Sequence, residues 1–456
     1  MITFQSTSLS GSSINCAIFT GPKKGLQITT ALAGLPQNTG VLAVENAIFL
    51  GGTSIESNGN YPFSSYFPLD RSPSAPTLQL TSAIINDSTV SNGNTFSESI
   101  LIITSKLYNT TIRPIATLGG IQFVNSKLIN ITIKLENNYQ NTPALLQFND
   151  SIIENTVEQY SNWWDPINVY MRVFRSIIRN SLFARAFVDQ YYYYGRGAHS
   201  FILQDSTIEN VSIDIVGSDS YYYYYGTYTN YYGSIFMNNS TFNNGTIRIF
   251  GYGSSATFQD SRFCDVNIAY VNPSQYYSKG VNIKNVIFRN VSMNLPVSHV
   301  LISYSTIELK SPPLVLGDHS AIVCSLIKRS LSIAQENTTG IQTTGTNIIL
   351  STISSFAVGL QVAYNTIQKN FILNSNFISN SLFHIRNFSP YNIEATGNWW
   401  GTRYSADIRN KIYDYWNSIN LGGVICSNPS DEKLQAEDSC PPYNVYTIIT
   451  NFANVA

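Results

Sequence analysis

Hydrophobic and polar residues follow one recurring pattern along most of this chain, and it is clearest in residues 205–215, DSTIENVSIDI. A serine is followed by an apolar residue two positions later, by an asparagine after two more, and then by Ser or Thr and a further apolar residue. Other copies begin at Asn125, Asn239 and Asp260, and weaker ones at Asp150 and Asn285. An internal repeat of this kind is typical of a solenoid.

The period of the repeat predicts the fold. Thirteen copies lie between Ser88 and Ser375, with Val286 in place of the serine in one of them, and the mean step is about 24 residues. Strand-like alternation without helical segments favours an all-β, right-handed parallel β-helix, in which successive coils stack about 4.8 Å apart. The apolar residue of each copy is expected to face the interior, as for Leu107, Leu128, Ile153, Ile208, Phe242, Phe263 and Phe288.

An asparagine recurs four residues after the repeat serine, as at Asn109, Asn130 and Asn210, with Asp265 in its place once. Asparagine tolerates positive φ and hydrogen-bonds its own backbone, so this column predicts a turn at the same place in every coil. Stacked amides can also hydrogen-bond from coil to coil. We expect this column to be structural.

The solenoid divides the chain into three predicted regions. Residues 1–80 are predicted to form irregular N-terminal coils and a cap, and residues 81–397 the regular β-helix. Residues 398–456 are predicted to form a C-terminal cap and tail, because the repeat ends there.

The segment that follows the last repeat contains GNWWGT at residues 397–402, then Ile412-Tyr413-Asp414 and Gly423-Val424. It resembles the closing segment of extracellular repeat proteins of the pectin-lyase-like superfamily, in the branch of non-catalytic surface proteins with an NWWG motif. The resemblance implies a parallel β-helix but no particular activity, because the superfamily includes lyases, hydrolases, adhesins and inert surface proteins. Since a solenoid needs its open end covered, we expect Trp399 and Trp400 to form a cap rather than a ligand platform.

Aromatic residues fill the longest insertions between repeats, which lie between Ser151 and Ser240. Insertions at one place in successive coils project from the same flank of a solenoid. Three interpretations remain open: stacking on sugar rings, contact with protein partners including sister subunits, and low-complexity loops. The predicted interaction flank consists of Trp163, Trp164, Tyr191, Tyr192, Tyr193, Tyr194, Tyr221, Tyr222, Tyr223, Tyr224, Tyr225, Tyr231, Tyr232, Tyr276 and Tyr277.

The chain is poor in charge, with 12% charged residues and a net charge of −1. Typical globular proteins have about 25%. This balance excludes electrostatic attraction to nucleic acid or to an anionic membrane. No apolar run approaches the roughly 18–20 residues of a membrane helix, and the first residues do not resemble a signal peptide. Uncharged polar residues, and glycans if present, must keep the surface soluble.

N-x-[S/T] sequons are frequent and predict an extracellular or cell-surface glycoprotein that carries N-linked glycans. The repeat itself contains this tripeptide, so sequons in the asparagine column can arise from the repeat without being glycosylated. Inward-facing amides, in addition, cannot carry sugar. The better candidates lie outside that column: Asn86, Asn149, Asn238 and Asn337. The remaining candidates are Asn109, Asn130, Asn210, Asn239, Asn244 and Asn290.

Five cysteines occur, at positions 16, 264, 324, 426 and 440, without a CxxC spacing. A zinc or thioredoxin-like site is therefore not indicated. Cys426 and Cys440 flank a short polar stretch, and we predict a local disulfide between them. The odd count leaves a free thiol or an intermolecular bridge.

Recognisable catalytic groups are absent. The chain lacks the Asn-Thr-Asp, Asp-Asp, Gly-His-Gly and Arg-Ile-Lys groups of pectin hydrolases and the Arg-x-Pro-x-x-Arg pattern of calcium-dependent lyases. A column of aspartates precedes the repeat serine, at a place where turns commonly use Asp, and the four histidines share no spacing. We therefore expect no catalytic residue, no metal ligand and no cofactor; the aspartates are Asp87, Asp150, Asp205 and Asp260.

These observations predict a non-catalytic extracellular glycoprotein with a structural or adhesive role, built as a rigid β-helix. Its partners would be further copies of itself, in filaments among other assemblies, or surface polysaccharide contacted through the aromatic flank. The alternatives are a carbohydrate-active enzyme, either a polysaccharide lyase or a glycoside hydrolase, and a pure glycan-binding module on the same fold. An enzyme predicts carboxylates that converge in a groove, and a binding module predicts exposed rings in line.

Overall fold

The computed structural model describes residues 2–5, 13–21, 26–30, 42–59, 78–92, 99–114, 120–135, 144–160, 169–183, 199–216, 233–250, 253–271, 280–364 and 370–435. The chain forms two compact units. The first comprises Met1–Ser240 with Phe250–Gly253, and the second comprises Thr241–Ile249 with Ser254–Ala456. Both are built from short parallel strands, so the predicted parallel β-helix is confirmed.

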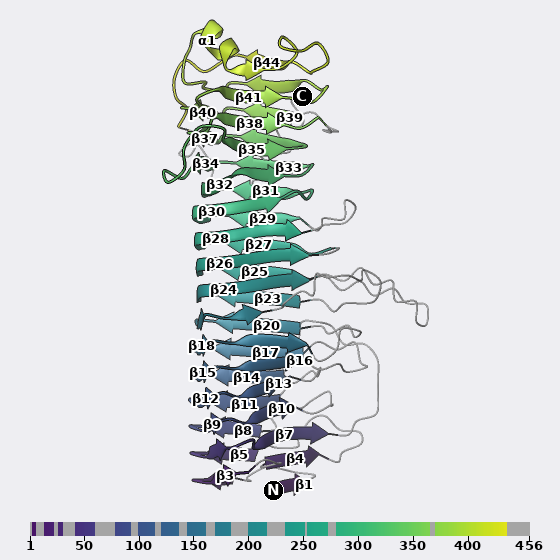
Figure 1. Ribbon diagram of the computed structural model, residues 1–456, viewed down its shortest axis with the longest axis vertical. Helices are drawn as coiled ribbons and strands as arrows, with labels where there is room; N and C mark the ends of the chain where they lie inside the picture. The colour runs from purple at the N-terminus through teal and green to yellow at the C-terminus, as the bar shows by residue number, and fades with distance from the viewer. Residues whose placement is uncertain are drawn as a thin grey trace, which may run out of the picture. The chain divides into compact units, whose positions relative to one another are not determined.

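The strands of the first unit form three parallel stacks, in which each coil pairs with the next (Figure 1). The first stack contains β2 (Ser13–Asn15), β5 (Leu42–Glu45), β8 (Leu78–Thr81), β11 (Ser99–Ile103), β14 (Gly120–Val124), β17 (Ala144–Asn149), β20 (Val169–Phe174), β23 (His199–Gln204) and β25 (Ser234–Asn238). The second contains β3 (Ile18–Thr20), β6 (Ile48–Leu50), β9 (Ile84–Asn86), β12 (Lys106–Tyr108), β15 (Lys127–Ile129), β18 (Ile152–Glu154) and β21 (Ile177–Arg179). The third contains β1 (Ile2–Gln5), β4 (Leu26–Thr30), β7 (Ser54–Gly59), β10 (Thr89–Asn92), β13 (Thr111–Arg113), β16 (Thr132–Leu135), β19 (Val157–Tyr160) and β22 (Leu182–Phe183). The long strand β24 (Thr207–Val216) continues both the second and the third stack.

The second unit repeats this plan with longer strands at first. Its first stack contains β27 (Ser255–Gln259), β29 (Val281–Lys284), β31 (Val300–Ser303), β33 (Ser320–Val323), β36 (Thr346–Ile349), β39 (Asn370–Leu373), β42 (Ile393–Thr396) and β44 (Val424–Ser427). The long strands are β26 (Thr241–Phe250), β28 (Arg262–Val271), β30 (Ile287–Leu295) and β32 (Thr306–Leu316). Beyond β32 two stacks separate, one with β34 (Leu326–Arg329), β37 (Thr352–Ser354) and β40 (Asn376–Ile378), the other with β35 (Thr339–Thr343), β38 (Val358–Val362), β41 (Phe383–Asn387) and β43 (Ile412–Tyr413). The helix α1 (Ser405–Asn410) precedes β43.

Two residues with positive φ bend a coil on either side of a three-residue strand. β18 lies between Asp150 and Asn155, with φ of 51° and 52°. Asn and Asp enter this left-handed region at low cost because their short side chains hydrogen-bond locally. The predicted turn column is confirmed, since positive φ is found at Asn109, Asn130, Asn155, Asn180, Asn210, Asn244, Asp265 and Asn290.

The amides of this column point outward and form the expected coil-to-coil contacts. Asn130 Nδ2 donates to Asn109 Oδ1 at 3.1 Å, and Asn155 Nδ2 donates to Asn130 Oδ1 at 3.1 Å. Asn210 makes the same bond to Asn180 at 3.0 Å. All five side chains are exposed. These asparagines therefore form the turns while their side-chain amides face outward.

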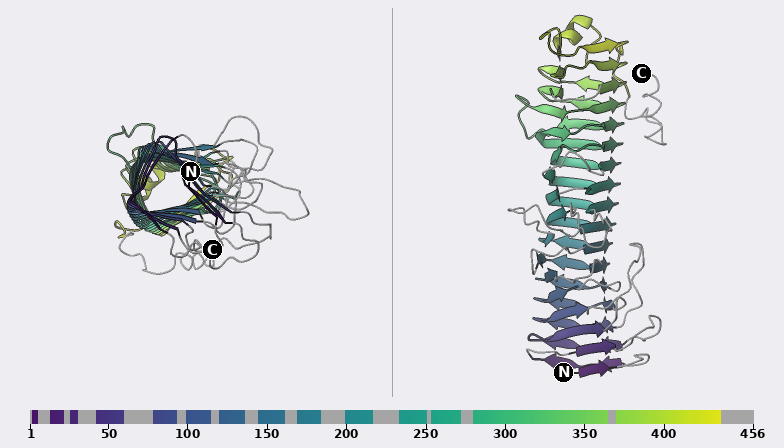
Figure 2. Two further views of the ribbon diagram at one scale, coloured as in Figure 1. Left: turned by 90° about the horizontal axis from the view of Figure 1, so that it is seen from below. Right: turned by 90° about the vertical axis from the view of Figure 1, so that its right-hand side faces the viewer.

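The repeat serines line the interior as a hydrogen-bonded ladder. Ser176 Oγ accepts the N–H of Ser151 at 3.0 Å, and Ser151 Oγ accepts the N–H of Ser126 at 3.1 Å. Each coil thus satisfies a buried backbone donor of the coil before it. Figure 2 shows the stacked strands of these coils from two further sides. The apolar residues predicted to face inward are at most 1% exposed: Leu107, Leu128, Ile153, Ile208, Phe242, Phe263 and Phe288.

The NWWG segment packs into the last coils of the second unit. Trp400 is 1% exposed and stacks on Phe377, with ring centroids 5.1 Å apart. His384 packs beside this indole at 5.9 Å, and burial, reinforced by the positive charge of Lys411, lowers the pKa of His384 to about 4. Trp399 is half-buried, and its backbone forms an isolated parallel β-bridge with that of Asn376. Trp400 is therefore a core residue and presents no exposed platform.

Candidate functional site

Four neighbouring strands of the first unit, β17, β20, β23 and β25, present side chains to the outside in register. Strand side chains alternate between two faces, and Met171 and Val173 of β20 are buried, so Tyr170, Arg172 and Phe174 face outward. The register places the outward residues of the four strands in three columns: Leu145, Tyr170, Ser200 and Ser234; Gln147, Arg172, Ile202 and Phe236; Asn149, Phe174, Gln204 and Asn238. We call this set the outer face.

Three aromatic rings lie on the outer face. Phe236 is 36% exposed, and Tyr170 and Phe174 are half-buried. Phe174 and Phe236 lie two coils apart in adjacent columns, about 10 Å along the stack. Exposure of an aromatic ring to water is unfavourable, so an apolar surface that binds over the ring lowers the free energy. The rings therefore provide flat apolar contact sites that are separated by two coils.

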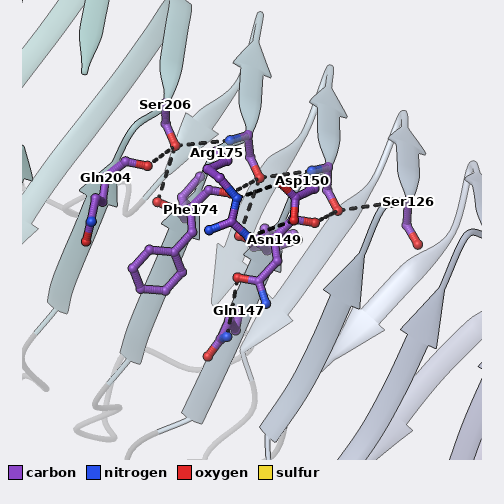
Figure 3. A network of polar contacts seen from close by, with 12 residues as sticks. Ser126, Gln147, Asn149, Asp150, Phe174, Arg175, Gln204 and Ser206 are labelled. Atoms are coloured by element: carbon purple, nitrogen blue, oxygen red, sulfur yellow. Dashed lines mark hydrogen bonds and ion pairs between the residues drawn. The ribbon is translucent and has the colours of Figure 1, made fainter. Parts of the chain in front are cut away.

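Amide groups surround these rings, and one guanidinium lies among them. Gln147, Asn149 and Gln204 lie beside the phenyl ring of Phe174 (Figure 3). Gln147 Nε2 donates to Asn149 Oδ1 at 3.4 Å. Each amide offers donors and an acceptor, which suits it to a ligand rich in hydroxyl groups.

Two buried polar atoms of the outer face are unsatisfied. Arg172 Nε and Asn238 Oδ1 have no hydrogen-bond partner in the part of the chain that the structure describes. Buried polar atoms are normally paired, so this donor and this acceptor mark places where a water or a ligand group completes the bonding. Among the described side chains of the outer face, Arg172 is also the one that carries a charge.

A column of charged residues borders the outer face at the turn that follows each strand. Arg175 binds Asp150 of the preceding coil through Nε–Oδ1 at 2.7 Å and Nη2–Oδ2 at 2.8 Å (Figure 3). The hydrogen bond from Arg175 holds the pKa of the Asp150 carboxyl below its ordinary value. Asp205 accepts a bond from Asn239 Nδ2 at 2.6 Å. The aspartates that precede the repeat serine are thus turn residues, and Arg175 separates Asp150 from Asp205.

A second charged column runs parallel to the first on β18, β21 and β24. Arg179 Nε contacts Glu209 Oε2 at 2.7 Å, and its Nη1 contacts Glu154 Oε1 at 3.5 Å. These contacts, the one to Glu209 above all, raise the pKa of Arg179. Arginine therefore alternates with carboxylates in both columns, an arrangement that one sequence repeat does not reveal.

The predicted aromatic flank, from Trp163 to Tyr277, lies outside the described residues. Three of its segments directly precede β20, β23 and β25, the strands that carry the outer-face rings. Val169 of β20 pairs with His199 of β23, and Ser200 of β23 pairs with Ser234 of β25. The described strands that follow these segments thus begin in register along one edge of the outer face.

The glycosylation candidates differ in exposure. Asn86, Asn149 and Asn238 are half-buried, and the serines of their sequons, Ser88, Ser151 and Ser240, are buried. Asn337 is exposed, Asn290 is half-buried, and the other candidates are exposed: Asn109, Asn130, Asn210, Asn239 and Asn244. Glycosylation of these sites stays a prediction.

The predicted disulfide between Cys426 and Cys440 is wrong. Cys426 is a free thiol, as are Cys16 and Cys264, whereas Cys324 is disulfide-bonded. Cys426 pairs in register with Ala395, which faces inward, and burial raises the pKa of its thiol to about 11. Cys440 lies outside the described residues.

Two of the histidines that seemed unrelated in sequence lie side by side. His299 and His319 stack in neighbouring coils, with ring centroids 5.3 Å apart. Within the described ranges no group of three or more His, Cys, Asp or Glu side chains is arranged to hold a metal ion. Over those same ranges, none of the helices combines the length and apolarity needed to cross a membrane.

Among known proteins, likeness to this chain is found with solved structures. No protein-family model matches the chain, and no curated protein matches it. Among solved structures, a mannuronic acid specific polysaccharide family 6 lyase enzyme from human gut microbiota matches with 9% identity and a TM-score of 0.21. The match covers 99% of this chain and 93% of that chain. The likeness concerns the parallel β-helix fold alone.

The prediction that the chain is not an enzyme is not upheld, because it rested on missing sequence motifs, and one fold serves enzymes and non-enzymes alike. The matched solved structure is itself described as a lyase. The non-catalytic branch inferred from the NWWG segment is likewise not confirmed.

Proposed function

We propose that the first unit binds an extended carbohydrate chain along the outer face. The observation that carries the proposal is the register of β17, β20, β23 and β25, which places aromatic rings and amides in shared columns. An unsatisfied donor on Arg172 and an unsatisfied acceptor on Asn238 lie in the same columns.

The chemistry of a sugar polymer fits this surface. The C–H face of a sugar ring packs on an aromatic ring, as Phe174 and Phe236 offer, and sugar hydroxyls exchange hydrogen bonds with the amides of Gln147 and Gln204. A polymer repeats both features along its length, and the outer face presents them in turn along the stack: amides on β17, rings on β20, an amide on β23, and a ring and an amide on β25. Several weak contacts in series then add to a useful affinity.

Binding of this kind would serve adhesion to a polysaccharide surface, in line with the predicted extracellular location. The aromatic flank, if it projects from the same edge, would add further rings to the contact. Self-assembly through that flank stays a separate prediction.

Binding is tested with the purified chain against a panel of neutral and acidic soluble polysaccharides, by affinity electrophoresis and calorimetry. We expect one class to bind, and we expect Phe174→Ala and Phe236→Ala each to weaken that binding about threefold to tenfold. Phe371→Ala is the matched control, because Phe371 is a half-buried outward phenylalanine in β39 of the second unit. Absence of binding to every class, or equal weakening by the control, would overturn the proposal.

The same mixtures are assayed for new reducing ends over time. Cleavage of the bound polymer would make the outer face the substrate site of an enzyme, and unchanged polymer would leave it a binding site.

A further inference from the structure

Two histidine side chains lie side by side on the surface of the second unit. His299 directly precedes β31 and His319 directly precedes β33, and these two strands pair in parallel in neighbouring coils (Figure 1). Both imidazole rings are exposed, and they stack with centroids 5.3 Å apart and an interplanar angle of 13°. The carbohydrate contact proposed above lies on the first unit. The histidine pair is therefore a separate surface feature.

Backbone hydrogen bonds fix the spacing of the pair. Both residues have positive φ, 64° for His299 and 55° for His319. The N–H of His299 donates to the carbonyl oxygen of Asp318 at 3.0 Å. The N–H of Val300 donates to Oγ of Ser320 at 3.2 Å. Because both bonds tie one turn to the next, the two histidines are held at the spacing of adjacent strands, about 4.8 Å.

Glycines occupy the same position in the coils on either side of the pair. Gly280 precedes β29 in the coil before, and Gly345 precedes β36 in the coil after. Gly280 has φ of 86°, and a Cβ atom there would come within 2.4 Å of the carbonyl oxygen of His299. Since neither glycine has a side chain, this column leaves the two imidazoles room to tilt toward each other.

The spacing of the two histidines suits a shared metal ion. Histidines four positions apart on a helix, as in the zinc-binding H-E-x-x-H motif, have Cβ atoms about 5–6 Å apart and bind one ion together. Adjacent strands give His299 and His319 nearly the same separation. A metal–nitrogen bond is about 2.0–2.1 Å long, so two nitrogen ligands of one ion lie at most about 4 Å apart. The exposed rings reach that distance by tilting inward from the stack.

A carboxylate in the same turn adds negative charge. Asp318 directly precedes His319, and its Oδ1 is buried without a hydrogen-bond partner in the part of the chain that the structure describes. Buried polar atoms are normally paired. Carboxylates commonly accept the second ring N–H of a metal-bound histidine and so orient the ring. Asp318 can therefore orient a ligating imidazole and stabilise a cation electrostatically.

We propose that His299 and His319 together bind one divalent transition-metal ion of the kind that prefers imidazole nitrogen, such as Ni²⁺, Cu²⁺ or Zn²⁺. The two rings are the protein ligands, and Asp318 is a positioning residue. Over the described ranges no group of three or more His, Cys, Asp or Glu side chains surrounds a common point, so water or a donor group of another molecule completes the coordination. Affinity depends on both rings, because the second one binds intramolecularly once the first has bound.

Calorimetric titration of the full chain with Ni²⁺ tests the site, after accessible thiols have been alkylated so that they do not bind the metal. We expect one site, with an affinity that falls about a hundredfold in His299→Gln and in His319→Gln. His384→Gln, which removes a buried histidine beside Trp400, is the matched control and should bind Ni²⁺ as the parent chain does. Absence of binding to the parent chain, or equal affinity in the parent chain and both variants, would overturn the proposal.

Electron paramagnetic resonance of bound Cu²⁺ identifies the ligands. The nitrogen hyperfine pattern should report two imidazole nitrogens in the parent chain and one in His319→Gln, and the same pattern in both would show that the rings do not share an ion. Asp318→Asn should weaken Ni²⁺ binding about tenfold while both nitrogens remain, and Asp318→Glu should restore much of the affinity. Unchanged affinity in Asp318→Asn would overturn the positioning role.

Discussion

The guanidinium of Arg175 holds the carboxylate of Asp150 in the preceding coil through two contacts, Nε–Oδ1 at 2.7 Å and Nη2–Oδ2 at 2.8 Å. Arg175 makes them from a left-handed backbone conformation, with φ of 48°, that Asn, Asp and Gly adopt far more readily. Its chain neighbour is Phe174 on the outer face. The ion pair therefore fixes the end of the strand that carries one of the proposed contact rings.

Replacing Arg175 with Asn separates the backbone effect from the ion pair. Asn suits the left-handed turn, while the two contacts to Asp150 are lost, and exposed ion pairs contribute little to stability. We expect the melting temperature of Arg175→Asn to stay close to that of the parent chain and its dependence on salt to decrease. Unfolding of the variant at ordinary temperature, followed by circular dichroism, would contradict this.

Acidification should weaken the second unit through His384. Its pKa is about 4 in the folded chain and 6.5 in the unfolded chain, so the unfolded state binds the additional proton between these values. The contribution of His384 to the free energy of unfolding is fully present above pH 6.5. It is lost as the pH drops toward 4, which lowers the free energy of unfolding by roughly 3 kcal/mol. The free energy of unfolding of His384→Gln, measured by denaturant titration, should fall correspondingly less over this pH range. His319→Gln, at an exposed ring, is the control and should behave as the parent chain does.

Asp414 should be essential to the loop before β44. Its side chain is 0% exposed, pairs with Arg409, and accepts the N–H of Val424 at 2.7 Å and of Trp416 at 3.1 Å. Burial alone would raise the pKa of Asp414, but these donors, Arg409 foremost, outweigh it and lower the pKa. The stabilisation is therefore present above the ordinary pKa of an aspartate and is lost as the pH falls through the folded value.

Removing the Asp414 charge leaves Arg409 without its partner. We expect Asp414→Asn to lower the free energy of unfolding by about 3 kcal/mol, as measured by denaturant titration. Asp407→Asn, an exposed change on α1, should cost much less. Equal losses in the two variants would show that burial of Asp414 does not matter.

Removal of a single hydroxyl group from the serine ladder should lower the stability of the chain. Ser176→Ala removes the acceptor of the Ser151 N–H, a buried donor, and should destabilise the chain by about 2 kcal/mol in denaturant unfolding. Thr207→Ala, a half-buried outward change in the next coil, is the control and should have a smaller effect. A neutral Ser176→Ala would mean that the N–H finds another partner.

The repeat predicts the fold because each of its positions has one physical task. Ser206 and Ile208 face the interior and Asn210 has φ of 55°, as the pattern requires. The outer face was missed because its signal lies before the repeat serine, where the buried Met171 and Val173 alternate with outward aromatic and charged residues. A pattern centred on the serine does not include that strand.

The repeat pattern also does not predict the contacts that side chains make between coils. Glu158 pairs in register with the inward-facing Ile133 and is 2% exposed, although its neighbours in sequence suggest an ordinary polar strand. His299 and His319 meet because one coil there is 20 residues long, not about 24. Such features depend on local coil length and on chain routing, which a mean period does not contain.

The most direct test of carbohydrate binding is a hydrogen-exchange footprint of the full chain with and without a saturating polysaccharide from the panel. The proposal predicts slower exchange in β17, β20, β23 and β25 and no change in β31, β33 and β36. The footprint should weaken in Phe174→Ala and persist in Phe371→Ala. Protection elsewhere in the chain, with none in these four strands, would contradict the outer face as the binding surface.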